Sequence, residues 1–67
     1  MANVIQIHNI NLIAASSGGH TETVTMLLEK GADVNAKNQG GSTALIKASE
    51  NRHTETVGLL KQYGAKE

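Results

Sequence analysis

Three histidines are the residues of this sequence best suited to bind a metal ion: His8, His20 and His53. A neutral imidazole is a common zinc ligand. The chain has no cysteine, so it offers no thiolate ligand and no disulfide. His20 and His53 stand 33 residues apart in closely similar surroundings. That spacing favours the same structural role in two equivalent turns, and we predict no metal site.

The sequence gives little support to nucleophilic or acid–base catalysis. Ser16 and Ser49 have no Gly-x-Ser-x-Gly setting, and Glu22 and Glu55 are spaced as capping carboxylates rather than as a pair in a cleft. The glycine pairs 18–19 and 40–41 lack the Gly-x-x-x-x-Gly-Lys pattern of a phosphate loop. We therefore predict a protein that is not an enzyme and that needs no cofactor.

Length and charge narrow the class of protein further. A chain of 67 residues allows a single domain, 1–67. Six basic and six acidic residues balance, which argues against binding a nucleic acid or an anionic membrane as the main function. Residues 1–17 lack lysine and arginine, and polar residues interrupt their apolar run, so they make a poor secretory signal. We expect a soluble, intracellular, cytoplasmic protein.

An internal repeat is the main feature of the chain. When the sequence is aligned with itself at an offset of 33, 13 of 34 positions are identical, without a gap. Twelve of these identities fall between residues 12 and 32. A fixed period of this length indicates stacked supersecondary units.

Each unit reads as helix, tight turn, helix and long turn. The apolar residues after position 11, and again after position 44, have the spacing of one helical face. Thr21, Thr54 and Thr43 are the predicted N-cap residues. Gly31 and Gly64 are predicted to end the second helices, where a left-handed residue is favoured.

Three segments carry a family resemblance. Gly31-Ala32-Asp33-Val34-Asn35-Ala36, Gly41-Ser42-Thr43-Ala44-Leu45-Ile46 and Gly19-His20-Thr21-Glu22-Thr23-Val24 resemble, in register, the inter-repeat turn and the two helix openings of ankyrin repeats. The resemblance covers residues 10 to 65. It implies an all-α fold of helix-turn-helix repeats, joined by an extended β-turn or hairpin loop into a short solenoid stack. It also implies structural histidines and a protein partner.

The second unit departs from the family pattern. Ala44 and Ile46 replace the usual proline and histidine, Arg52 stands where the first unit has a glycine, and Gly58 lies within a helix. If the turn at Arg52 needs a positive φ, its side chain costs about 1 kcal/mol. Lys61 replaces an apolar stacking residue, which is typical of a C-terminal cap. We divide the chain into repeat 1, residues 10–36, and repeat 2, residues 37–67.

The segment 1–9 has no counterpart in the family pattern. Its apolar residues either fold back as an irregular cap on the first helix pair, form a self-association surface, or belong to a disordered tail. Since Ile5-Gln6-Ile7 alternates, strand pairing between two copies is one route to a homodimer. Two repeats are fewer than the three that usually hold such a stack together, so a dimer would add burial. The predicted self-association residues are Val4, Ile5, Ile7 and Ile10.

The resemblance places partner binding on the tips of the long turns and on the inner face of the first helices. Tyr63 is the one aromatic residue; it is either a binding hot spot or a cover for the last helix. The predicted function is non-catalytic protein–protein interaction, and the alternative is a structural, self-assembling unit. The predicted partner-binding residues are Ser17, Gly18, Lys30, Gln39, Gly40, Ser42, Lys47, Glu50, Asn51 and Tyr63.

Overall fold

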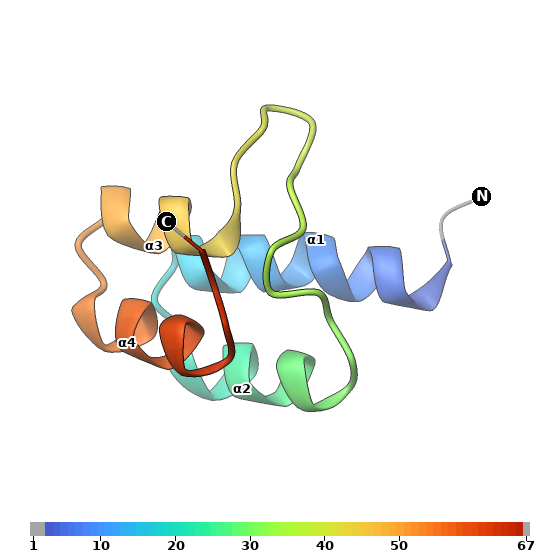
Figure 1. Ribbon diagram of the computed structural model, residues 1–67, viewed down its shortest axis with the longest axis horizontal. Coiled ribbons are helices and arrows are strands. Elements are labelled where there is room, and N and C mark those ends of the chain that lie inside the picture. Colours follow the sequence, from blue (N-terminus) through green and yellow to red (C-terminus); the bar gives the residue numbers. More distant parts are fainter. Residues whose placement is uncertain (1–2, 67) are drawn as a thin grey trace.

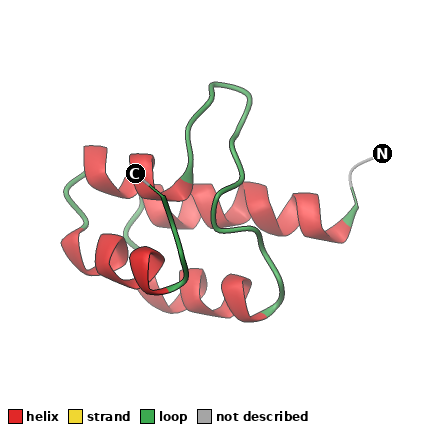
Figure 2. Ribbon diagram, in the orientation of Figure 1, coloured by secondary structure: helices red, strands yellow, loops and turns green. Residues whose placement is uncertain are grey.

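The computed structural model describes residues 3–66 and contains four helices in two layers (Figure 1). One layer pairs α1 (Val4–Ser17) with α3 (Ala44–Glu50), and the other pairs α2 (Thr21–Glu29) with α4 (Thr54–Gln62). No strand occurs within residues 3–66 (Figure 2), and the loop between α2 and α3 projects away from both layers. The predicted all-α repeat stack is confirmed.

A continuous apolar core joins the two repeats. Leu27 of α2 and Leu60 of α4 are both buried in it, so the helix pairs share one seam as the 33-residue period predicts. The side chains are small and aliphatic because the chain has no phenylalanine or tryptophan. The buried apolar residues are Leu12, Ile13, Ala15, Val24, Leu27, Leu28, Val34, Ala44, Leu45, Ala48 and Leu60.

Glycine ends both second helices as predicted. Gly31 and Gly64 have φ values of 97° and 93°, in the left-handed region that glycine adopts without strain. The residue after each glycine returns its N–H to a carbonyl five residues back, from Ala32 to Leu27 and from Ala65 to Leu60. These bonds satisfy carbonyls that the helix end would otherwise leave without partners.

The helix N-termini confirm the predicted N-cap role of Thr43 and correct the same prediction for Thr21 and Thr54. The Thr43 hydroxyl accepts from the Ile46 N–H at 3.2 Å and caps α3 as predicted. The prediction for Thr21 and Thr54 is wrong, because each is the first helical residue and the N-caps are His20 and His53. The Thr21 hydroxyl instead lies 3.2 Å from the Thr56 hydroxyl, a hydrogen bond between repeats.

The N-terminal segment also differs from prediction. Residues 4–9 are neither an irregular cap nor a strand, because α1 starts at Val4 and runs without a break into repeat 1; residues 1 and 2 lie outside the described part. Asn3 and Gln6 form a capping box: the Asn3 side chain accepts from the Gln6 N–H, and the Gln6 side chain accepts from the Asn3 N–H. This reciprocal cap favours a helix over the extended pairing that alternation indicated.

Arg52 adopts the backbone conformation that we suspected from its glycine counterpart. Its φ is 60°, and that of Gly19 in repeat 1 is 73°. A non-glycine residue in this region carries strain of about 1–2 kcal/mol. Repeat 2 therefore contains a strained turn that repeat 1 avoids.

Candidate functional site

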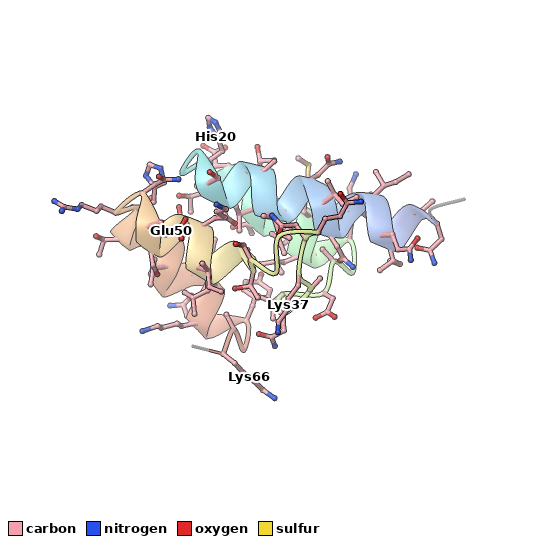
Figure 3. The ribbon with its side chains drawn as sticks, turned by 90° about the horizontal axis from the view of Figure 1, so that it is seen from above. His20, Lys37, Glu50 and Lys66 are labelled. Atoms are coloured by element: carbon pink, nitrogen blue, oxygen red, sulfur yellow. The ribbon has the colours of Figure 1, made fainter. Side chains whose placement is uncertain are left out.

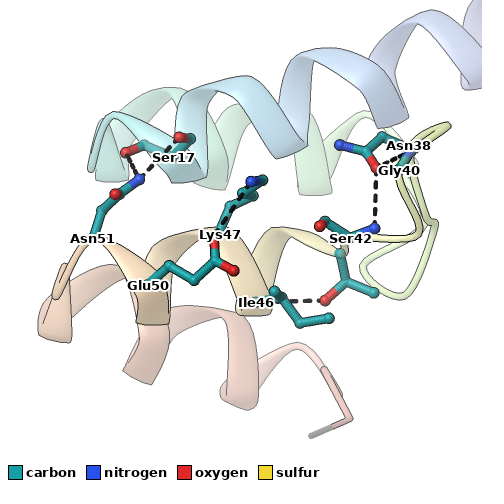
Figure 4. Close-up of polar contacts among 9 residues, drawn as sticks. Ser17, Asn38, Gly40, Ser42, Ile46, Lys47, Glu50 and Asn51 are labelled. Carbon is teal, nitrogen blue, oxygen red and sulfur yellow. Dashed lines mark hydrogen bonds and ion pairs between the residues drawn. The ribbon is translucent and has the colours of Figure 1, made fainter.

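The projecting loop, residues 36–43, is here named the finger. Asn38 organises it: the Asn38 Oδ1 accepts from the N–H groups of Gly40 (2.9 Å) and Ser42 (3.0 Å), and the Asn38 N–H donates to the Ser42 carbonyl (2.9 Å). Figure 4 shows the Asn38 side chain with its hydrogen bonds to Gly40 and Ser42. Gln39 and Gly40 stand exposed at the tip. The tip is therefore a defined turn rather than a loose chain.

Beside the finger, α3 presents a polar face of balanced charge. The Lys47 Nζ lies 3.2 Å from the Glu50 Oε1, one helical turn apart, and both side chains are partly or well exposed. An exposed ion pair of this kind adds little stability. Since the two charges cancel, this face carries no strong preference for an acidic or a basic partner.

Ser17 and Asn51 meet across the repeats, at the ends of α1 and α3. The Asn51 Nδ2 donates to the Ser17 carbonyl at 2.9 Å and to the Ser17 Oγ at 3.0 Å (Figure 4). The His53 Nε2 lies 3.0 Å from the same carbonyl. Ser17 and Asn51 thus use hydrogen-bonding groups to join the two repeats, and fewer of those groups are left to bind a partner.

The two histidines of the repeat have different surroundings. The His53 ring packs on Gly19, where an added Cβ would come within 2.6 Å of the His53 Nδ1. His20 is exposed at the outer edge of repeat 1, and within residues 3–66 it has no bond to a second repeat (Figure 3). No three His, Asp or Glu side chains of the described residues gather as metal ligands. The geometry gives His53 a structural role.

The structure divides the predicted partner-binding set between two layers. Lys30 and Tyr63 are the C-caps of α2 and α4, in the layer away from the finger, and both are exposed. The other eight residues lie on the finger or at the ends and faces of α1 and α3. They are Ser17, Gly18, Gln39, Gly40, Ser42, Lys47, Glu50 and Asn51.

The four predicted self-association residues, Val4, Ile5, Ile7 and Ile10, are all exposed on α1, which has no Asp, Glu, Lys or Arg. The Ile5 Cδ1 lies toward Gly31, 3.5 Å from where a Cβ on that glycine would stand. Ile10 lines a depression together with Lys37 of the finger. Residues that form one apolar cluster in the sequence thus have different neighbours in the fold.

Sequence reasoning missed the asparagines that fix the loop. Asn35 bridges its own turn to the chain end, donating to the Gly64 carbonyl at 3.2 Å and accepting from the Lys66 N–H at 2.9 Å. The Asn9 Oδ1 accepts from the Asp33 N–H at 2.6 Å. For Asn38 a signal existed, since asparagine just before glycines favours an Asx turn. Asn9 and Asn35 act over more than 23 residues, and no local pattern marks them.

None of the described helices is long and apolar enough to cross a membrane. Among curated proteins, the chain is 57% identical over 37 residues to the probable E3 ubiquitin-protein ligase XBOS33 of Oryza sativa subsp. japonica. Over 37 residues it is 54% identical to the E3 ubiquitin-protein ligase XBAT33 of Arabidopsis thaliana. Each match covers 55% of this chain and only 7% of the relative.

A family described as ankyrin repeats (3 copies) matches residues 5–67. This range includes the finger, the helices α2, α3 and α4, and all of α1 except Val4. The chain belongs to the ankyrin-repeat family.

Proposed function

We propose that this chain is a non-catalytic module that binds a protein partner through the finger tip and the face of α3. Ankyrin repeats are protein–protein interaction modules. The observation that carries the proposal is the turn held by Asn38, which presents Gln39 and Gly40 beside the Lys47–Glu50 pair. A preformed loop loses little conformational entropy when it binds a partner.

The size of this surface limits what one copy achieves. A finger tip and a two-turn helix α3 offer an interface at the low end, below about 1,200 Å² in total. We therefore expect weak binding by a single copy. The ligases that it resembles match over 7% of their length, so we attribute to this chain partner binding and not ubiquitin transfer.

The test compares the two layers of the stack. Gln39→Ala combined with Glu50→Ala removes exposed side chains beside the finger, and Lys30→Ala combined with Tyr63→Ala does the same in the other layer. Both double variants should keep the helical circular dichroism spectrum. Proteins captured from the native host by the immobilised chain should fall at least tenfold with the first variant and stay unchanged with the second. The reverse pattern would reject the proposed surface.

Exposed apolar residues on α1 favour a second candidate function, self-association into a homodimer. Val4 and Ile7 are exposed on a helix without charge, and burying them against a second copy would add to a small core. Sedimentation measures the mass directly. Ile7→Lys with Ile10→Lys should convert a dimer to a monomer, whereas Met26→Lys, at an exposed apolar residue of α2, should not. A wild-type monomer at millimolar concentration would exclude this candidate.

A further inference from the structure

A groove runs between the finger and the N-terminal half of α1, on the other side of the finger from α3. Figure 1 shows α3 and this half of α1 extending in opposite directions from the base of the finger. We name it the finger groove. Its lining residues are Gln6, Asn9, Ile10 and Ile13 from α1, and Ala36, Lys37, Asn38, Gln39 and Gly40 from the finger.

The groove exists because repeat 1 has no finger of its own. At the 33-residue offset, residues 4–10 of α1 align with residues 37–43 of the finger. The capping box at Asn3 and Gln6 makes this stretch helical, so no second loop lies beside the first. Asn9 fastens the helix to the base of the loop through the Asp33 N–H. Both walls of the groove are therefore fixed in place.

The finger wall carries unused backbone groups. Asn38 donates its N–H to Ser42 within the finger, but the residues on either side of it, Lys37 and Gln39, make no backbone hydrogen bond to any part of residues 3–66. Unpaired N–H and C=O groups along a non-helical edge are a template for an extended chain. Such a chain gains its affinity from main-chain hydrogen bonds and its specificity from side-chain contacts.

The side chains specify the charge of the occupant. Lys37 is the one charged residue that lines the groove, and within residues 3–66 it forms no ion pair. Lys66 does not line the groove; it lines a different depression, beside Thr43 and Ile46 at the start of α3. Figure 3 shows Lys37 and Lys66 on the same side of the molecule. Ile10, 60% exposed, supplies an apolar floor. A lysine without a carboxylate among the lining residues of the groove favours an acidic partner.

We infer that the finger groove binds an extended segment of a partner protein that carries a carboxylate side chain near an aliphatic one. The segment pairs its backbone with Lys37 and Gln39, places its carboxylate at Lys37, and rests its aliphatic side chain on Ile10. The groove shares Gln39 and Gly40 of the finger tip with the proposed function, but it uses the N-terminal half of α1 in place of the face of α3.

The probe is a displayed library of random linear dodecapeptides, selected against the immobilised chain. Enriched peptides should carry net negative charge and an aliphatic residue close to an acidic one. Lys37→Glu and Ile10→Ser should each weaken their binding at least tenfold, whereas Lys30→Glu, at a lysine that does not line the groove, should not. Circular dichroism verifies the fold of each variant; Ile10 is exposed, so its replacement should leave the core intact.

A second measurement uses the unaltered chain. Binding of an enriched peptide should shift the amide resonances of Lys37 and Gln39 and slow their hydrogen exchange. The inference is overturned if selection yields no acidic peptide. It is equally overturned if the enriched peptides tolerate Lys37→Glu and Ile10→Ser but lose binding with Lys47→Ala and Glu50→Ala together, because those two residues lie on α3 and do not line the groove. That last result would support the proposed function and reject the groove.

Discussion

Repeat 1 and repeat 2 place the same residue types at equivalent positions and give them different surroundings. Ile13 is 6% exposed, whereas its counterpart Ile46 is 39% exposed. Ser16 is buried and Ser49 is exposed. Repeat 2 covers this side of repeat 1, and no part of the described chain covers the same side of repeat 2. Burial in this fold is thus set by the neighbouring repeat rather than by the local sequence.

The opposite side of the stack shows the reverse relation. Ala44 and Thr56 of repeat 2 are buried against repeat 1, while their counterparts Asn11 and Thr23 are exposed. At one of these two positions the repeats differ in sequence, because repeat 1 has the polar Asn11 where repeat 2 has Ala44. At the far side a charge has replaced an apolar residue, Lys61 for Leu28. Polar substitutions thus mark both outer faces, although Ile46 keeps an apolar side chain on one of them.

The largest expected effect of a single substitution is at the two equivalent isoleucines. Ile13→Ala removes a buried side chain and should lower the free energy of unfolding by about 3 kcal/mol. Ile46→Ala should cost about 1 kcal/mol, because part of that side chain is already in water. Urea unfolding followed by circular dichroism measures both. Equal losses would show that the exposed face of repeat 2 is covered in solution, by a second copy for instance.

Smaller effects of single substitutions are expected at the two tight turns. Gly19→Ala adds a Cβ in a left-handed conformation and within 2.6 Å of the His53 Nδ1, so it should cost about 2 kcal/mol. Arg52→Gly should stabilise the chain by up to about 1 kcal/mol, since it relieves the positive φ. Arg52→Ala is the matched control and should bring no gain. Thermal unfolding of the three variants separates strain from the loss of the arginine side chain.

Much of this fold was predictable because each position of the repeat occurs twice in the sequence, and the two copies support the same structural assignment. The period placed Leu27 and Leu60 in one seam, and the glycines at 31 and 64 marked both helix ends. The N-terminal half of α1 was not predictable, since residues 4–9 have no second copy in helical form and their alternation resembles a strand. The partner-binding set divided between layers because sequence spacing does not show which layer a helix end joins.

The histidines should differ less than the turns. His53→Ala loses the bond to the Ser17 carbonyl and the packing on Gly19, which we expect to cost about 1.5 kcal/mol. His20→Ala should cost less than about 0.5 kcal/mol, because the His20 side chain is exposed and makes no hydrogen bond to repeat 2 within residues 3–66. Chemical denaturation of both variants provides the comparison. A similar loss for both would locate the effect within each turn and not in the seam between repeats.

The serines offer the smallest and most selective comparison. Among the residues that the structure describes, the buried Ser16 Oγ has no hydrogen-bond partner, and a buried, unsatisfied hydroxyl costs about 1–3 kcal/mol. Ser16→Ala removes that cost, and it also gains helix propensity, as Ser49→Ala does at the exposed position. The free energy of unfolding should therefore rise by about 1 kcal/mol more for Ser16→Ala than for Ser49→Ala. Loss of stability with Ser16→Ala would mean that the hydroxyl has a partner in solution, and that the seam between the repeats contains a polar contact.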